Sequence, residues 1–161
     1  MDKSGDASYF DTLMFNHVLG GYFGSRLMKN IREEKGLTYG IYSAMNHFLH
    51  ESFWVIAAEV NQQNAERAMD EIRSEIRLLQ DKPISQTELD TARNYFIGSW
   101  QSENATLFAV AEKLKSLHLW NLPEDYYTRL LNHLREITPE QVQYAANYYL
   151  PSTDLFEIQV G

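Results

Sequence analysis

Two neighbouring segments with a strand-like pattern, set between helical ones, constrain the fold of this 161-residue chain more than any other feature. Residues 38–48 alternate and carry no helical signature, and residues 52–60 are rich in β-branched and aromatic side chains. Such runs, separated by a short turn near His50 and Glu51, are typical of a β-hairpin. An antiparallel pair of strands is therefore expected in the first half of the chain.

Helical periodicity dominates the rest of the chain. Apolar residues three and four positions apart, together with proline and glycine breaks, predict helices over 9–19, 23–35, 65–79, 85–103, 105–119, 123–134 and 139–149. Ser85 and Thr138 each begin a sequence typical of a capping box at a helix start. Near the end, Phe156, Ile158 and Val160 alternate and predict a closing strand.

This order of elements predicts an α+β domain, a two-layer sandwich in which helices cover one face of an antiparallel sheet. Residues 1–161 are interpreted as a single domain, because the sequence shows no linker, internal repeat or low-complexity tract. Three strands are few for so many helices. We therefore expect at least one strand of the sheet to be missing.

Composition excludes several classes of function. The absence of cysteine rules out a disulfide scaffold, a thiolate metal site and a cysteine nucleophile. A formal charge of −8 without a basic stripe argues against nucleic-acid binding. No apolar run approaches the roughly 18 residues that a membrane span needs. The polar start does not resemble a signal peptide, and cytoplasm and bacterial periplasm both stay open as compartments.

The histidines do not form a metal-binding pattern. The segment His47-Phe48-Leu49-His50-Glu51 differs in order from the His-x-x-Glu-His motif of zinc peptidases, and it falls in the predicted hairpin rather than on a helix. His17, His118 and His133 are isolated, with no partner three or four positions away on the same helix. We predict no metal ligand and no catalytic residue in this chain.

Arg32 and Tyr39 form the most informative pair. Arg32 lies in the last turn of a predicted helix, Tyr39 starts the first strand, and Gly36 lies where a left-handed turn would fold one back beside the other. A guanidinium and a phenol that point to the same place could donate to the backbone carbonyls of an extended peptide. The alternative is structural, with Arg32 complementing the helix dipole and Tyr39 packing. Spacing alone favours that alternative.

Five segments resemble the C-terminal, non-catalytic half of insulinase/pitrilysin-type zinc peptidases, the family of the mitochondrial processing peptidases. These are Asn16–Gly21 with Ser25–Leu27, the stretch Ile31–Tyr39, and the two C-terminal regions that begin at Ser85 and Ile137. The Arg-Glu-Glu-Lys-Gly-Leu-Thr-Tyr segment, residues 32–39, is the specific part of this match. The resemblance covers residues 8–161.

The resemblance implies a clamshell of two similar α+β halves, in which the other half carries zinc on a His-x-x-Glu-His helix. Arg32 and Tyr39 match the spacing of an arginine and a tyrosine that contact substrate in active members, which makes them the expected substrate-binding residues here. This chain has no zinc motif, so zinc is expected in the partner half. The family's half also begins with a strand, for which Met1–Ser8 is too short and polar, so this strand is expected to be missing.

We therefore expect this chain to be the substrate-binding, non-catalytic half of a zinc-dependent endopeptidase that hydrolyses peptides in a closed chamber. By itself it would not be an enzyme, and its partners would be a zinc-bearing half and a peptide. A homo-oligomer of the isolated domain is also expected from an open sheet edge. One alternative is a structural subunit of the same fold without peptidase activity. Another is an unrelated helix-rich binding module.

Overall fold

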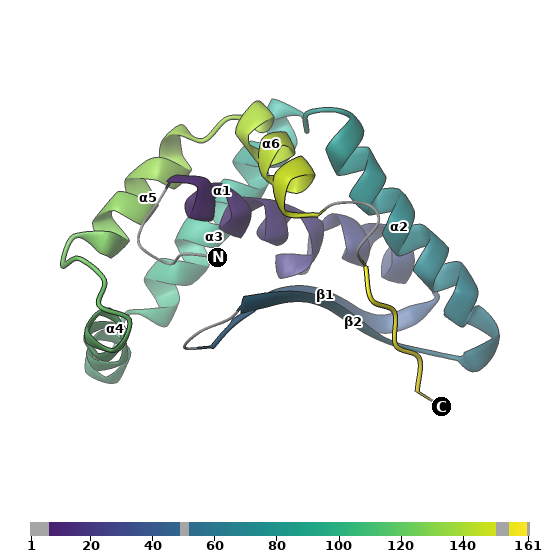
Figure 1. Cartoon of the computed structure of the whole chain (residues 1–161), viewed down its shortest axis with the longest axis horizontal. Coiled ribbons are helices and arrows are strands. Elements are labelled where there is room, and N and C mark those ends of the chain that lie inside the picture. Colours follow the sequence, from purple (N-terminus) through teal and green to yellow (C-terminus); the bar gives the residue numbers. More distant parts are fainter. Residues whose placement is uncertain (1–6, 49–51, 151–154, 161) are drawn as a thin grey trace.

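The computed structural model describes residues 7–48, 52–150 and 155–160, and in this part of the chain helices lie over one face of a two-stranded sheet (Figure 1). The first helix is followed by two short π-helical segments and then by the hairpin. The elements are α1 (Ala7–Asn16), η1 (His17–Gly21), η2 (Met28–Glu34), β1 (Thr38–His47), β2 (Ser52–Val60), η3 (Gln62–Asn64), α2 (Ala65–Asp81), α3 (Gln86–Glu103), α4 (Leu107–Leu119), α5 (Tyr126–Glu136) and α6 (Pro139–Tyr149). The predicted α+β, two-layer architecture is confirmed.

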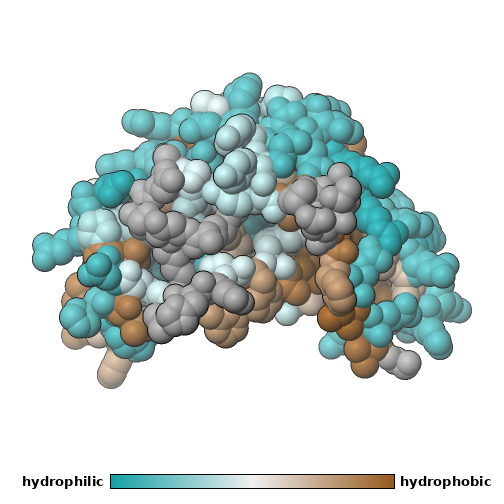
Figure 2. All heavy atoms as spheres, in the orientation of Figure 1, coloured by the Kyte–Doolittle hydropathy of each residue, from teal (hydrophilic) through white to brown (hydrophobic). Residues whose placement is uncertain are grey.

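The hairpin pairs β1 with β2 in antiparallel register, with Ile41 opposite Ala58 and Met45 opposite Trp54. Side chains alternate between the two faces of a strand, so these four residues face the helices, and all four contact the buried core. Tyr42 and Phe53 point to the other face and are more than half exposed. No described helix covers that face, and the outline of the molecule is hollowed beneath it (Figure 2).

Asn16, the last residue of α1, joins the helical layer to the sheet. Its side-chain amide donates to the Ser43 carbonyl at 3.3 Å and accepts from the Trp54 indole at 2.8 Å. The Ser43 hydroxyl in turn donates to the Asn16 carbonyl at 3.1 Å. These bonds satisfy polar groups at the end of α1 and fix the position of η1 above β1.

Gly20 marks the closest approach of η1 to the sheet. A Cβ atom at this position would lie 2.7 Å from the Ser43 backbone nitrogen, so either the helical segment or the strand would have to move. We predict that Gly20→Ala lowers the free energy of unfolding by about 1–3 kcal/mol, the usual cost of overpacking. Chemical denaturation measures the change.

Gly98→Ala is the matched control, because a Cβ at Gly98 in α3 meets nothing within 4 Å. It should raise the free energy of unfolding by roughly 0.5–1 kcal/mol, because alanine loses less backbone entropy than glycine in a helix. Equal stability changes in the two variants would show that η1 does not approach β1 as closely as the structure places it.

The helix starts follow their predicted caps, with one difference. Thr138 and Gln141 form the full capping box at the start of α6. At α3 the Ser85 hydroxyl accepts from the Glu88 backbone, as predicted, but the Glu88 side chain does not complete the box. It pairs with the Arg26 guanidinium through bonds of 2.7 and 2.9 Å. A tertiary ion pair has therefore replaced the local bond, and it ties α3 to the segment before η2.

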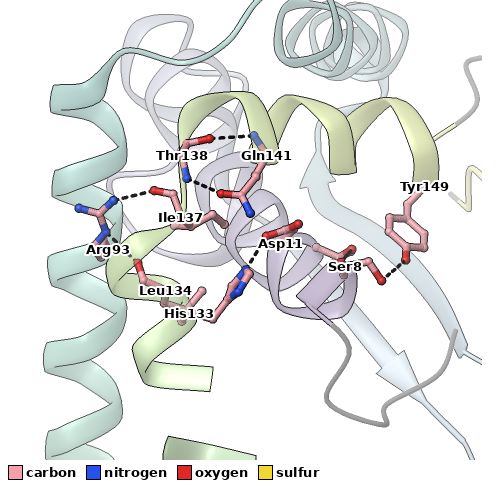
Figure 3. A network of polar contacts seen from close by, with 10 residues as sticks. Ser8, Asp11, Arg93, His133, Leu134, Ile137, Thr138, Gln141 and Tyr149 are labelled. Carbon is pink, nitrogen blue, oxygen red and sulfur yellow. Dashed lines mark hydrogen bonds and ion pairs between the residues drawn. The ribbon is translucent and has the colours of Figure 1, made fainter. Parts of the chain in front are cut away.

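Polar contacts also link the helices to one another (Figure 3). Asp11 of α1 lies 2.6 Å from the His133 imidazole of α5. Arg93 of α3 donates to the carbonyls of Leu134 and Ile137, at 2.8 and 2.9 Å, and so satisfies carbonyls at the end of α5 that have no partner in the helix. These bonds hold α1, α3 and α5 together around the buried apolar core.

The predicted closing strand is wrong for the described residues. Residues 155–160 are not part of a strand, and Phe156, Ile158 and Val160 are 77–92% exposed. Glu157 anchors this segment through bonds of 2.6–2.8 Å to Arg73 of α2. Alternation identified strand-forming side chains, but a strand also needs a neighbouring edge, and β2 does not pair with this segment.

Candidate peptide-binding site

The end of η2 places Arg32 beside the start of β1. Gly36 has a φ of +60°, in the left-handed region where glycine carries no steric penalty, and it reverses the chain after the helical segment. The Leu37 backbone N–H then donates to the Ile31 carbonyl at 2.9 Å, and Leu37 is buried. The predicted glycine turn therefore folds Arg32 back against the first residues of the strand.

A β-bulge shapes the strand at the same point. Thr38 pairs with Val60 and Ile41 with Ala58, so Tyr39 and Gly40 together lie opposite Glu59. The Thr38 hydroxyl lies 2.6 Å from the Glu59 carbonyl and 2.8 Å from the Gly40 carbonyl, and it accepts from the Gly40 N–H at 3.2 Å. The bulge turns Tyr39 out of the regular alternation, and its side chain is 98% exposed.

Arg32 and Tyr39 do meet, but through a different atom from the one that the sequence suggested. The Arg32 Nε donates to the Tyr39 backbone carbonyl at 2.8 Å. The Tyr39 phenol extends into solvent instead of lying beside the guanidinium. One donor of Arg32 is therefore committed to the fold, whereas its terminal amino groups have no hydrogen-bond partner among the described residues.

Both residues line a surface pocket of about 640 Å³ at this end of the hairpin. The other lining residues come from the turn after η2 and from the end of β2, namely Gly36, Leu37, Thr38, Glu59, Val60 and Asn61. The pocket therefore offers donors from Arg32, Tyr39 and Asn61, together with one carboxylate from Glu59. Such a mixed polar surface suits the alternating carbonyls and amides of an extended peptide backbone.

Three residues of this site were not singled out by the sequence. Thr38 and Glu59 belong to it because of the bulge, whose position the alternation of the strands does not reveal. Phe23 belongs to it because its ring lies under the Arg32 guanidinium, 4.9 Å from the ring centroid. The pattern of apolar residues placed Phe23 on the buried face of a helix, yet it lies in a turn and is 57% exposed.

The described residues hold no cluster of three or more histidine, aspartate or glutamate side chains that could bind a metal ion. His47 is engaged in the hairpin, 2.9 Å from the Tyr9 hydroxyl and 2.8 Å from the Ser52 hydroxyl. His50 and Glu51 lie outside the described residues. The side chains that the structure describes therefore do not fit a zinc site, and no chemical step is assigned to a metal bound here.

None of the helices in the described ranges is both long and apolar enough to span a bilayer.

Comparison with proteins of known sequence reveals distant relatives that are much longer than this chain. The non-peptidase homolog YmxG of Helicobacter pylori is 27% identical over 88% of this chain and 32% of its own length. The uncharacterized zinc protease YmxG of Bacillus subtilis is also 27% identical, over 59% of this chain and 23% of its own length. The chain thus spans a third or less of these relatives.

Solved structures share the fold. The peptidase M16 inactive domain from Pseudomonas fluorescens superposes with a TM-score of 0.82 and 29% identity, over 94% of this chain and 36% of that one. A putative zinc protease from Bordetella pertussis gives a TM-score of 0.74 at 20% identity, over 91% of this chain and 81% of that one.

A family model described as the peptidase M16 inactive domain matches residues 2–96, which include η2, the hairpin and the whole pocket. This match covers more than half of the chain and agrees with the resemblance carried by residues 32–39. The chain belongs to the peptidase M16 inactive domain family.

Proposed function

We propose that this domain is the substrate-binding, non-catalytic half of a zinc-dependent endopeptidase. The observation that carries the proposal is Arg32, which one bond fixes to the Tyr39 carbonyl while its terminal amino groups are left for a ligand at the rim of the pocket. Relatives named zinc proteases support the reaction class. The zinc of the partner half would activate water for amide hydrolysis.

The residues of this chain would bind and orient the peptide. Arg32 would donate to a backbone carbonyl of the peptide, and the Tyr39 phenol would donate to a second one when the two halves close. The uncovered sheet face, with Tyr42 and Phe53, would form a wall of the chamber. Positioning of this kind raises turnover without contributing a reacting atom.

Recombining the halves tests this function. The chain alone should neither cleave a quenched fluorescent peptide nor bind stoichiometric zinc. The separate zinc-bearing half should gain peptidase activity when this chain is added. A zinc-bearing half that is equally active without this chain would contradict the proposal.

A structural role without turnover is the second candidate, because one relative is named a non-peptidase homolog. The two candidates differ in the neighbouring half of the full protein. A His-x-x-Glu-His motif there favours the peptidase, and its absence favours the structural subunit.

We also propose that the isolated chain self-associates through its open sheet. Both strands have a free edge among the described residues, and Phe48 and Phe53, stacked 5.8 Å apart, are more than half exposed near the turn of the hairpin. A second copy offers the same edge and the same apolar side chains. Light scattering at micromolar concentration should therefore show dimers or larger species.

Phe53→Lys should shift this equilibrium toward monomer, because it places a charge on the uncovered face. Tyr144→Lys is the control, since Tyr144 is also well exposed, at 62%, but lies on α6 in the helical layer. A wild-type chain that stays monomeric would contradict the proposed self-association.

A further inference from the structure

Phe23 is an exposed aromatic side chain at the candidate site with no role in the core. It lies in the turn between η1 and η2, and its ring is 57% exposed. Its ring contacts a cation, because the Arg32 guanidinium lies 4.9 Å from the ring centroid, within the range of a cation–π interaction.

Arg32 is thereby held by two different elements. The ring of Phe23 attracts the guanidinium, and the Tyr39 carbonyl accepts from its Nε at 2.8 Å. The planar group can satisfy both contacts and keep its terminal amino groups for a third partner. A free arginine side chain would lose considerable rotamer entropy on binding a ligand, whereas one already held loses less.

We propose that Phe23 is a positioning residue that fixes the Arg32 guanidinium toward the pocket, so that it can donate to a backbone carbonyl of an extended peptide. This inference rests on the proposed function. It separates three roles within the site: Arg32 contacts the peptide, the Tyr39 carbonyl holds Nε, and the Phe23 ring holds the guanidinium in place.

The test is a double-mutant cycle on the full chain. The probe is a short acetylated and amidated peptide of alanine and glutamine, titrated while NMR records the backbone amides of the pocket. Phe23→Leu removes the aromatic face and keeps an apolar side chain, and it should weaken binding by about two- to fivefold. Phe23→Tyr keeps the face and should bind as the wild type does. Phe108→Leu, at an 87% exposed phenylalanine of α4, should change nothing.

Phe23→Leu should have no further effect in an Arg32→Ala chain, because Phe23 acts through Arg32. A similar loss in both backgrounds would overturn the inference, since Phe23 would then contact the peptide directly. Weak binding by Arg32→Ala together with normal binding by Phe23→Leu would also overturn it and leave the proposed function standing. Normal binding by Arg32→Ala would overturn the proposed function, and this inference with it.

A second readout needs no peptide. Hydrogen exchange of the Arg32 Nε–H should be slowed by its bond to Tyr39 in the wild type and should accelerate in Phe23→Leu but not in Phe23→Tyr. Equal exchange rates in the three chains would overturn the positioning role.

Discussion

Replacing Arg32 with alanine should lower peptide turnover by the reunited, zinc-bearing protein by roughly 10- to 150-fold. The terminal amino groups of Arg32 would make a charge-assisted hydrogen bond to the peptide in a closed, partly dry chamber, and such a bond is worth about 1.5–3 kcal/mol. Each factor of ten in rate corresponds to about 1.4 kcal/mol. Steady-state kinetics on a quenched fluorescent peptide measure the change as kcat/KM.

A second contact variant, a control variant and two measurements on Arg32→Ala separate loss of peptide contact from loss of fold. Tyr39→Phe removes one neutral donor and should reduce kcat/KM less than Arg32→Ala does. Arg77→Ala removes an exposed arginine of α2 that does not line the pocket, and it should leave turnover unchanged. Arg32→Ala should cost only about 1 kcal/mol of stability, because both of its contacts lie at the surface, and zinc content should stay constant. Unchanged kcat/KM in Arg32→Ala would show that the peptide is held elsewhere.

Acidification should destabilise the domain through His17 by roughly 3 kcal/mol in total. His17 of η1 is 8% exposed, stacked 4.5 Å from the Tyr22 ring and edge-on to Phe96. This burial disfavours the charged imidazolium and lowers the pKa of His17 from 6.5 to about 4. The unfolded chain, with an ordinary histidine, therefore takes up a proton at higher pH than the folded one.

Because the unfolded chain binds a proton at higher pH, stability decreases as the pH falls. Stability contributed by neutral His17 is fully present above pH 6.5 and is lost as the pH falls from 6.5 toward 4, where the folded state also becomes protonated. Urea denaturation at pH 7 and pH 5 should therefore differ more in the wild type than in His17→Phe, which keeps an aromatic ring against Tyr22 and cannot titrate. An equal pH dependence in the two chains would contradict this role for His17.

The local pattern of apolar and polar residues predicted most of the secondary structure. The hairpin was predicted at residues 38–48 and 52–60 and is found at Thr38–His47 and Ser52–Val60. Alternation along a strand depends on neighbouring residues alone, and so does the Thr138 cap of α6. The same holds for the Gly36 turn, because a positive φ at a helix end favours glycine wherever it occurs.

Local sequence patterns predicted only part of the candidate site. The seven-residue spacing and the glycine turn predicted that Arg32 and Tyr39 would meet, and they do. The atom through which they meet depends on the bulge, which is a matter of register between β1 and β2 rather than of either strand alone. The pattern did not indicate that Phe23 belongs to the site, because an apolar residue at helical spacing is ordinarily interpreted as part of the core.

The sequence by itself thus determined most of the elements, their order and the turn that brings Arg32 back to the start of β1. The tertiary structure alone decided that Glu88 pairs with Arg26, that His17 is buried, and that Phe156 lies exposed outside any strand. The physical reason is the range of the interactions involved. Propensities and caps act within a few residues, whereas burial, ion pairs and strand pairing depend on segments that are brought together only when the whole chain packs.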